Sequence, residues 1–193
     1  MTTPMTDQGF ALFDTAIGRC GIAWTARGVV AVNLPEADER RTRSRLMRRC
    51  PQAREQAAPP AVARAIDGIV ALLRGEAADL TAVALDLAAV PAFNAQVYAI
   101  ARTIPPGRTM TYGDIAKRLR LSSDMPARDV GQAMGQNPFP LIVPCHRVVA
   151  AGGRSGGFSA NGGVVTKLRL LAIEGAPVDG TLPLFERAPG RPA

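Results

Sequence analysis

Residues that bind metals or form disulfides are rare in this sequence. Its 193 residues include three cysteines and one histidine, and neither Cys20 nor Cys50 has a CxxC partner. A structural zinc site needs four closely spaced Cys or His ligands, so the sequence predicts no metal site. An odd number of widely spaced cysteines also makes no disulfide framework and is typical of a reducing compartment such as the cytoplasm.

Aromatic residues and long apolar runs are also scarce. Only 5% of the residues are aromatic although 47% are hydrophobic, so a core must be built mainly from Ala, Val, Leu and Ile. The best apolar run, residues 81–93, is interrupted by Asp86 and Pro91 and is too short to span a membrane. Met1-Thr2-Thr3-Pro4 lacks the basic-then-apolar pattern of a signal peptide. We therefore expect a cytoplasmic protein with no membrane partner.

Acidic residues are sparse in the second half of the chain. Residues 1–91 hold 11 Arg and 10 Asp or Glu, whereas residues 92–193 hold 12 Lys or Arg and 6 Asp or Glu. The net charge of +7 is therefore divided as +1 and +6. This imbalance indicates a polyanionic partner that is bound mainly by the second half.

The first half has the pattern of a small α/β unit. Short apolar runs punctuated by glycine predict three strands, at residues 10–14, 21–25 and 28–34. Helices are expected from Glu36 onward and over residues 61–73, where apolar residues recur every three or four positions. The apolar segment 79–90 is either a linker or a last strand.

The helix that begins at Glu36 is crowded with arginine. Its six arginines are Arg40, Arg41, Arg43, Arg45, Arg48 and Arg49. One interpretation is a face that binds phosphate. The interpretation that we favour is a solvated helix with acid–base pairs four residues apart, such as Glu36–Arg40 and Glu39–Arg43.

From Ala92 onward the pattern becomes helical. Residues 93–101 form one predicted helix, and Thr111 can cap a second that covers residues 112–119. A polar turn then leads to a third short helix, residues 126–134, and the last two helices predict a helix-turn-helix. Gly131 within a helix costs up to about 1 kcal/mol relative to alanine, so we expect a close approach to the backbone there.

One thiol and the single histidine stand side by side in Pro144-Cys145-His146-Arg147. The strand-like run 137–143 leads into them. A thiol becomes a strong nucleophile as the thiolate, and His146 and Arg147 offer a proton acceptor and a positive charge. The alternative is an inert cysteine at a buried strand end. In the glycine-rich stretch that follows, Phe158 is either a wall for a planar ligand or the anchor of a surface loop.

Together these features resemble the O6-alkylguanine-DNA alkyltransferases, also called methylated-DNA–protein-cysteine methyltransferases, over about residues 10–176. The matching segments are 111–116, 127–134, 137–138, 144–148 and 167–175. The resemblance implies an α/β protein. A small N-terminal α/β, ribonuclease H-like domain (1–90) precedes a helical, winged-helix-like DNA-binding domain with the active-site Cys (91–176). A flexible tail (177–193) follows.

The same resemblance implies an activity. It predicts a monomeric DNA repair protein that flips O6-alkylguanine out of duplex DNA and transfers the alkyl group irreversibly to its own Cys145, once and without a cofactor. O4-alkylthymine is left open as a further substrate. Two rivals are a module that only recognises alkylated bases, which needs no nucleophile, and a thiol hydrolase, which needs a histidine distant in sequence.

Residue roles also follow from the resemblance. Cys145 is similar to the alkyl acceptor, His146 to the base that deprotonates it through a water, and Glu174 to the carboxylate that orients His146. Asn137 resembles the residue that organises the turn beside the active site, and Tyr112 the one that presses on the phosphate next to the damaged base. The residues expected to contact DNA or the base are Arg128, Ala127, Gly131, Tyr112, Arg147, Phe158 and Ser159.

Three features depart from the family pattern, and all bear on DNA affinity. Phe158 stands where some members have Tyr, so it can stack on guanine but cannot donate a hydrogen bond. Asp129 is an acid directly after Arg128, which resembles the finger that fills the stack behind the flipped base. The turn at residues 121–125 is longer and more polar than we expect.

Overall fold

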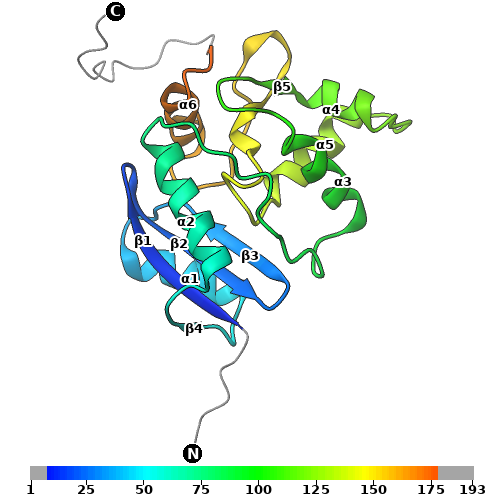
Figure 1. The fold of residues 1–193 in the computed structure, drawn as a ribbon. Coiled ribbons are helices and arrows are strands. Elements are labelled where there is room, and N and C mark those ends of the chain that lie inside the picture. The colour runs from blue at the N-terminus through cyan, green and yellow to red at the C-terminus, as the bar shows by residue number, and fades with distance from the viewer. Residues whose placement is uncertain (1–7, 178–193) are drawn as a thin grey trace, which may run out of the picture.

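The computed structural model describes residues 8–177. A four-stranded sheet lies between two helices, and a helical part stands at one end of it (Figure 1). The strands of this sheet are β1 (Gly9–Thr15), β2 (Gly18–Thr25), β3 (Gly28–Asn33) and β4 (Arg54–Glu55). The helices are α1 (Glu39–Arg49), α2 (Pro60–Leu73), α3 (Ala92–Ala101), α4 (Tyr112–Arg118), α5 (Pro126–Gly135) and α6 (Gly163–Ile173). A second, two-stranded sheet pairs β5 (Met110–Thr111) with β6 (Val148–Val149).

The larger sheet has the strand order β3-β2-β1-β4. Its first three strands are antiparallel neighbours, and they confirm the three strands predicted from the sequence. The two-residue β4 pairs in parallel with β1 and is too short to leave a pattern in the sequence. A mixed α/β fold with a small sheet and six helices among the described residues is therefore what the chain forms.

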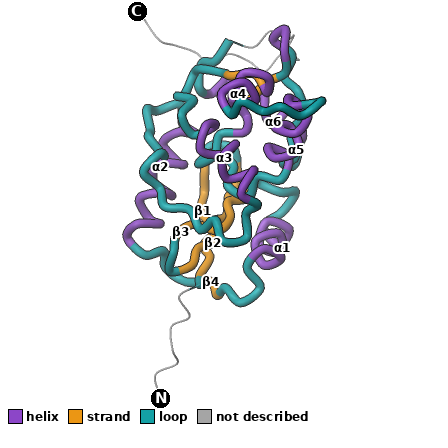
Figure 2. The backbone as a smooth tube through the Cα atoms, turned by 90° about the vertical axis from the view of Figure 1, so that its right-hand side faces the viewer, coloured by secondary structure: helices purple, strands orange, loops and turns teal. Residues whose placement is uncertain are grey.

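Alternating side chains of β2 pack on opposite faces of the sheet. Ile22 and Trp24 belong to the large hydrophobic cluster with α2, whereas Ala23 belongs to a smaller cluster with Leu46 of α1. This period of two is what a strand covered on both faces requires. The tube view shows the result, with α2 and α1 on opposite sides of the strands (Figure 2).

The segment 79–90 lies along the outer edge of β3. Val29 N donates to Ala84 O at 2.9 Å and Asp86 N donates to Val29 O at 2.8 Å, which leaves a single bridge between Val29 and Leu85. A Cβ on Gly28 would lie 2.5 Å from Ala84 O, so glycine permits the close approach. The segment is thus mainly a linker and touches the sheet edge at one point.

Helix α1 begins at Glu39, three residues later than expected. Asp38 caps it, with Arg41 N donating to Asp38 Oδ1 at 2.7 Å. Glu36 therefore lies ahead of the helix and cannot pair with Arg40 across one turn. It pairs with Arg45 instead, at 2.8 Å, so the predicted Glu36–Arg40 pair is wrong.

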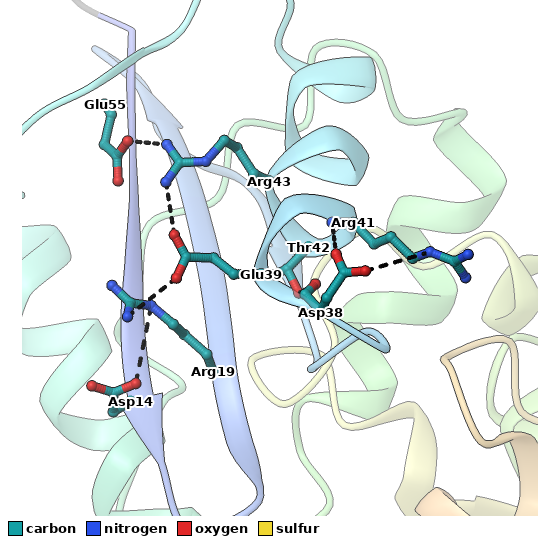
Figure 3. Close-up of polar contacts among 8 residues, drawn as sticks. All are labelled: Asp14, Arg19, Asp38, Glu39, Arg41, Thr42, Arg43 and Glu55. Atoms are coloured by element: carbon teal, nitrogen blue, oxygen red, sulfur yellow. Dashed lines mark hydrogen bonds and ion pairs between the residues drawn. The ribbon is translucent and has the colours of Figure 1, made fainter.

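The other acid–base pair predicted on α1 is present. Arg43 pairs with Glu39 at 2.9 Å and also with Glu55, and Arg19 lies 3.3 Å from the same Glu39 (Figure 3). Figure 3 shows a chain of alternating charges that continues from Arg19 to Asp14. These contacts favour the solvated acid–base interpretation of α1 over a phosphate-binding face.

The predicted pair of short helices is present as α4 and α5. Thr111 caps α4, since Asp114 N donates to Thr111 Oγ1 at 3.0 Å while Thr111 N donates to Asp114 Oδ2 at 3.1 Å. Helix α3 supports α5 from behind, where Tyr98 Oη donates to Ala133 O at 2.9 Å. The recognition element of the predicted helix-turn-helix is therefore held firmly from its inner side.

The run 137–143 was expected to resemble a strand, and this expectation is wrong. It is a buried irregular loop with one isolated bridge, between Pro140 and Val143. Prolines lack the backbone N–H that a sheet ladder needs, and Leu141 adopts a left-handed φ of 74°. Instead, Val32 N of β3 donates to Pro138 O at 2.8 Å, which seats the loop on the sheet edge.

The hydrophobic interior runs through both halves of the chain. One cluster joins Ile22 and Ile69 to Val97 and Val143. The division into domains 1–90 and 91–176 stays a prediction, and residues 178–193 of the expected tail lie outside the described residues. No helix within residues 8–177 has the length and apolar character to cross a membrane.

Candidate active site

Cys145 opens a 3₁₀ turn, Cys145–Arg147, that ends the buried loop. Its backbone N donates to Val143 O at 2.8 Å, so the turn is tied to the loop before it. The residue is only 8% exposed, yet it borders a cavity of about 510 Å³. A thiol in this position is shielded from bulk water and still reachable by a ligand that fills the cavity.

Most of the side chains predicted to contact DNA or the base line this cavity. From the expected set, the structure brings together Tyr112, Ala127, Arg128, Gly131, Phe158 and Ser159 around Cys145. The residues of α5 that line the cavity include Ala127, Gly131 and Gly135. A Cβ on Gly131 would lie 4.0 Å from the Tyr112 ring, which is ordinary contact, so no close approach to the backbone of Gly131 within the protein requires glycine there.

His146 lies on the opposite side of the turn from the cavity. It is 0% exposed, and its Nε2 lies 2.8 Å from Oε1 of Glu174, the residue that ends α6. This bond fixes the ring and leaves Nδ1 as the other nitrogen. Nδ1 is buried and has no hydrogen-bond partner among the described residues. The geometry agrees with the expected orienting role of Glu174.

Arg147 points away from the cavity as well. Its Nε and Nη2 donate to the two oxygens of Glu174 at 2.9 Å and 2.8 Å, and Nη1 donates to Ile104 O at 2.6 Å. Only 6% of the residue is exposed. The structure thus places Arg147 among the residues that support Glu174, and not at the DNA-facing wall where the sequence suggested it.

The pKa shifts of these groups favour a thiol that keeps its proton until a base removes it. Burial raises the pKa of the Cys145 thiol, although a hydrogen bond with Asn137 and the charge of Lys167 oppose the rise. Burial lowers the pKa of His146, so the ring is neutral and can accept a proton. Burial alone would raise the pKa of Glu174, but hydrogen bonds from His146 and Arg147 outweigh it and lower the pKa to about 2.

Asn137 holds the loop that carries the thiol. Its Nδ2 donates to Val143 O at 2.9 Å, and its Oδ1 accepts from Phe139 N at 2.9 Å. Both contacts are buried, and together they satisfy backbone groups that no sheet ladder could satisfy in this irregular loop. The geometry agrees with the role in organising the turn that the resemblance implies.

Lys167 is a residue of this site that the sequence reasoning missed. It is 0% exposed, and its Nζ donates to Val148 O at 2.5 Å and to Gly157 O at 3.3 Å. Nζ also lies 5.7 Å from the centre of the Tyr112 ring. Burial lowers the pKa of Lys167 to about 8. A usable signal was its spacing from the apolar Leu170 and Leu171, which places this lysine on the buried face of α6.

The other two cysteines lie away from the cavity. Burial raises the pKa of Cys20 to about 12, and it also raises the pKa of Cys50. Both side chains sit against the sheet, where Cys20 contacts Thr15 and Cys50 contacts Gln8. Of the three cysteines, Cys145 alone is among the residues that line this cavity.

The chain and its fold match known proteins. Residues 92–176 fit the family described as 6-O-methylguanine DNA methyltransferase, DNA binding domain. A methylated-DNA–protein-cysteine methyltransferase of Methanothermobacter thermautotrophicus is 32% identical over 160 residues, which are 83% of this chain and 81% of that protein. A DNA base-flipping protein of Thermus thermophilus is 39% identical over 113 residues, or 58% of this chain and 73% of that protein.

A solved structure shows the same arrangement. Mycobacterium tuberculosis OGT in complex with DNA superposes with a TM-score of 0.69 and 32% identity, covering 88% of this chain and 95% of that one. Similarity on this scale, over most of both chains, extends beyond the helix-turn-helix to the sheet. On the sequence match, the shared fold and the prepared thiol, this chain belongs to the family of methylated-DNA–protein-cysteine methyltransferases.

Proposed function

We propose that this protein repairs duplex DNA by moving the alkyl group of O6-alkylguanine to its own Cys145. The observation that carries the proposal is the position of Cys145, between a cavity of about 510 Å³ and the buried His146–Glu174 pair. The cavity admits a base and the pair supplies a proton acceptor. A site that only recognised a base would need the cavity but no such acceptor behind a thiol.

The first step is removal of the thiol proton. Because burial keeps the thiol protonated and His146 neutral, the proton passes from Cys145 to Nδ1 of His146, through a bridging water. Glu174 then stabilises the imidazolium through Nε2. Arg147 holds both oxygens of Glu174 and so keeps its orientation. The resulting thiolate faces the cavity.

The second step is an in-line displacement. The Cys145 sulfur forms a bond to the alkyl carbon, the bond from that carbon to O6 breaks, and its electron pair leaves with the guanine. Burial raises the pKa of Tyr112, so its hydroxyl keeps its proton and can donate a hydrogen bond to the departing guanine anion, which then takes a proton from solvent.

The base must leave the helical stack to enter the cavity, because the stacked lesion cannot reach a buried thiol. Arg128 is exposed at the start of α5 and borders the cavity, a position suited to filling the gap left in the stack. The small side chain of Ala127 and the absence of one at Gly131 permit close approach of α5 in the minor groove. Phe158 and Ser159 form the opposite wall.

The transfer consumes the protein. The thioether at Cys145 is not hydrolysed by a His–Glu pair, and no second thiol lines the cavity among the described residues. The protein itself is the acceptor, so the reaction needs no cofactor. Product should therefore stop at one equivalent of repaired guanine per protein.

The test is an active-site titration with excess O6-methylguanine duplex, followed by intact-protein and peptide mass spectrometry. The expected result is a gain of one methyl group on the Cys145 peptide and a plateau at one equivalent. Cys145→Ala should lose all transfer and keep DNA binding, while Cys20→Ala and Cys50→Ala should transfer normally. Transfer by Cys145→Ala, or product that rises past one equivalent, would overturn the assignment.

The same experiment separates the rival functions. The Thermus thermophilus relative is named a DNA base-flipping protein. Tight binding of the lesion with no mass gain would favour a module that binds without transfer, and turnover past one equivalent would favour a hydrolase. A parallel titration with O4-methylthymine duplex decides whether that base is a second substrate.

Further parts of the proposal concern fold and context. We propose that the sheet with α1 and α2 forms a ribonuclease H-like domain over residues 1–90. We also propose that α3 to α6 form a winged-helix-like domain over residues 91–176. We also propose that the protein acts as a monomer. We place it in the cytoplasm, where its DNA substrate lies.

A further inference from the structure

The turn between α4 and α5 presents an apolar side chain to solvent. Met125 is 54% exposed and is the most exposed large hydrophobic residue of the described chain. It is the N-cap residue of α5 and stands two positions before Ala127, which lines the cavity. A single exposed apolar side chain is common on protein surfaces, so its meaning depends on its neighbours.

This turn is fixed in place and does not hang free. Ser123 Oγ donates to Asp129 Oδ2 at 2.5 Å, which ties the turn to the first turn of α5. The chain leaves α4 through Arg120, which has a left-handed φ of 53°. These contacts give the unexpected acid Asp129 a task that does not involve DNA. They also hold Met125 at a defined position, at the N-cap of α5.

Met125 stands beside Arg128. Nη1 of Arg128 lies 3.7 Å from Sδ of Met125, so the two side chains project together from the start of α5. The turn that carries Met125 also contains the exposed acid Asp124, and it follows α4, whose last turn carries the exposed Lys117 and Arg118. An apolar tip next to a cation is the chemistry of a side chain that enters a nucleic-acid groove.

We propose that Met125 is a second, apolar wedge that enters the minor groove beside Arg128 and packs against the base pair next to the flipped guanine. The inference rests on the proposed function. Arg128 fills the gap in the stack, and Met125 pries open the neighbouring base step, since apolar side chains inserted between base steps unstack them. Flipping by this protein thus uses two adjacent side chains with different chemistry.

Met125→Ala should slow repair of O6-methylguanine duplex by about tenfold and leave the reaction with free O6-benzylguanine unchanged. Met125→Leu, which keeps an apolar side chain of similar volume, should repair within about twofold of the parent protein. Leu87→Ala is the matched control, since Leu87 is also exposed, at 39%, but lies in the linker along β3; both of its rates should be unchanged. Equal duplex rates for Met125→Ala and the parent protein would overturn the proposal.

A fluorescence measurement reports the wedge directly. The fluorescent base 2-aminopurine is placed next to the lesion in the duplex. Binding of the Cys145→Ala variant should increase its emission. The double variant Cys145→Ala, Met125→Ala should give only a small part of this increase. Arg128→Ala, measured beside it, separates the two levels of inference. If Arg128→Ala slows duplex repair and Met125→Ala does not, only the wedge fails. If neither does, the flipping mechanism itself fails.

The Ser123–Asp129 contact provides a second, independent test. Asp129→Asn keeps an oxygen that can accept from Ser123, whereas Asp129→Ala cannot accept. Duplex repair should therefore be about threefold slower in Asp129→Ala than in Asp129→Asn, with equal rates on free O6-benzylguanine. Identical duplex rates for the two variants would show that the position of Met125 is not used.

Discussion

The two sides of Cys145 are built in opposite ways. On the inner side, the side chains of His146, Arg147 and Glu174 are buried and joined by hydrogen bonds to Glu174. On the outer side, Ala127 and Arg128 are exposed at the start of α5, with a cavity behind them. The inner side has little freedom to change and the outer side has space to receive a ligand. Chemistry and recognition therefore meet at one sulfur atom but depend on separate sets of contacts.

This separation predicts which substrates each substitution affects. Damage to the inner side should slow every reaction of the thiol, because proton removal precedes any transfer. Damage to the outer side should slow reactions that require DNA and spare those of a free base. The ratio of duplex rate to free-base rate therefore diagnoses the side on which a substitution acts.

Replacement of the inner carboxylate should give the largest effect. Glu174→Gln removes the negative charge that stabilises the His146 imidazolium, so transfer should fall about 100-fold or more on both duplex and free O6-benzylguanine. His146→Ala should fall by a similar factor. Single-turnover rates with both substrates provide the check. A loss confined to duplex DNA would contradict the division between the two sides.

Arg128→Ala should show the reverse selectivity. Without a side chain to occupy the stack, the flipped state loses a few kcal/mol, and duplex repair should slow by about 30-fold. Reaction with free O6-benzylguanine should stay within about twofold, since Arg128 is exposed and its side chain contacts Met125 rather than Cys145 or His146. Equal losses on both substrates would assign Arg128 to the inner side.

Lys167 tests this comparison further because it acts on the thiol and also supports the cavity wall. Its charge favours the Cys145 thiolate, and its Nζ holds Gly157, whose neighbour Phe158 lines the cavity. Lys167→Met should slow iodoacetamide alkylation of Cys145 about tenfold at pH 7, equivalent to a rise of about one unit in the thiol pKa. Lys117→Met, on the exposed lysine of α4, is the control and should react normally.

The ratio of the alkylation rates of the parent protein and Lys167→Met should change with pH in one direction. Lys167 carries its charge below its pKa of about 8 and loses it as the pH rises. Its support of the thiolate is thus present at pH 7 and fades above pH 8. The difference between parent protein and Lys167→Met should therefore be largest near pH 7 and shrink toward pH 9.5. A ratio that does not change with pH would indicate a purely structural role.

The smallest expected effect is a change in the salt dependence of DNA binding when a basic residue of α4 or α1 is replaced. Lys117→Ala, in the last turn of α4, should lower the slope of log binding constant against log salt by about 0.9, the value of one phosphate contact. Arg43→Ala should leave the slope unchanged, because Arg43 is already paired with Glu39 and Glu55. Salt titrations of duplex binding compare the two. A lower slope for Arg43→Ala would make α1 part of the DNA surface.

Local patterns predicted much of the fold. The apolar run 21–25 predicted a strand, and Thr111 caps α4 as the sequence predicted. The adjacency of Cys145 and His146 predicted the reacting group that we propose. These signals are local because they depend on side chains within a few positions of each other.

Features that depend on tertiary contacts escaped prediction. Arg147 turns inward because Glu174, 27 positions later, offers two carboxylate oxygens there. Lys167 is buried because Val148 O and Gly157 O replace its hydration. Leu141 takes a left-handed φ that favours glycine, a conformation set by the packed loop around it. No window of neighbouring residues contains these partners.

The contact between β3 and the buried loop 137–143 also affects the solubility of the protein. β3 is an edge strand, and the outer groups of such strands can pair with other molecules and start aggregation. Here Val29 is occupied by the linker and Val32 by Pro138 of the loop that carries the thiol. A substitution that unseats this loop would therefore expose half of an edge strand. Variants with a disrupted loop would therefore lose solubility as well as repair activity. The solubility of the protein thus depends on the integrity of its active site.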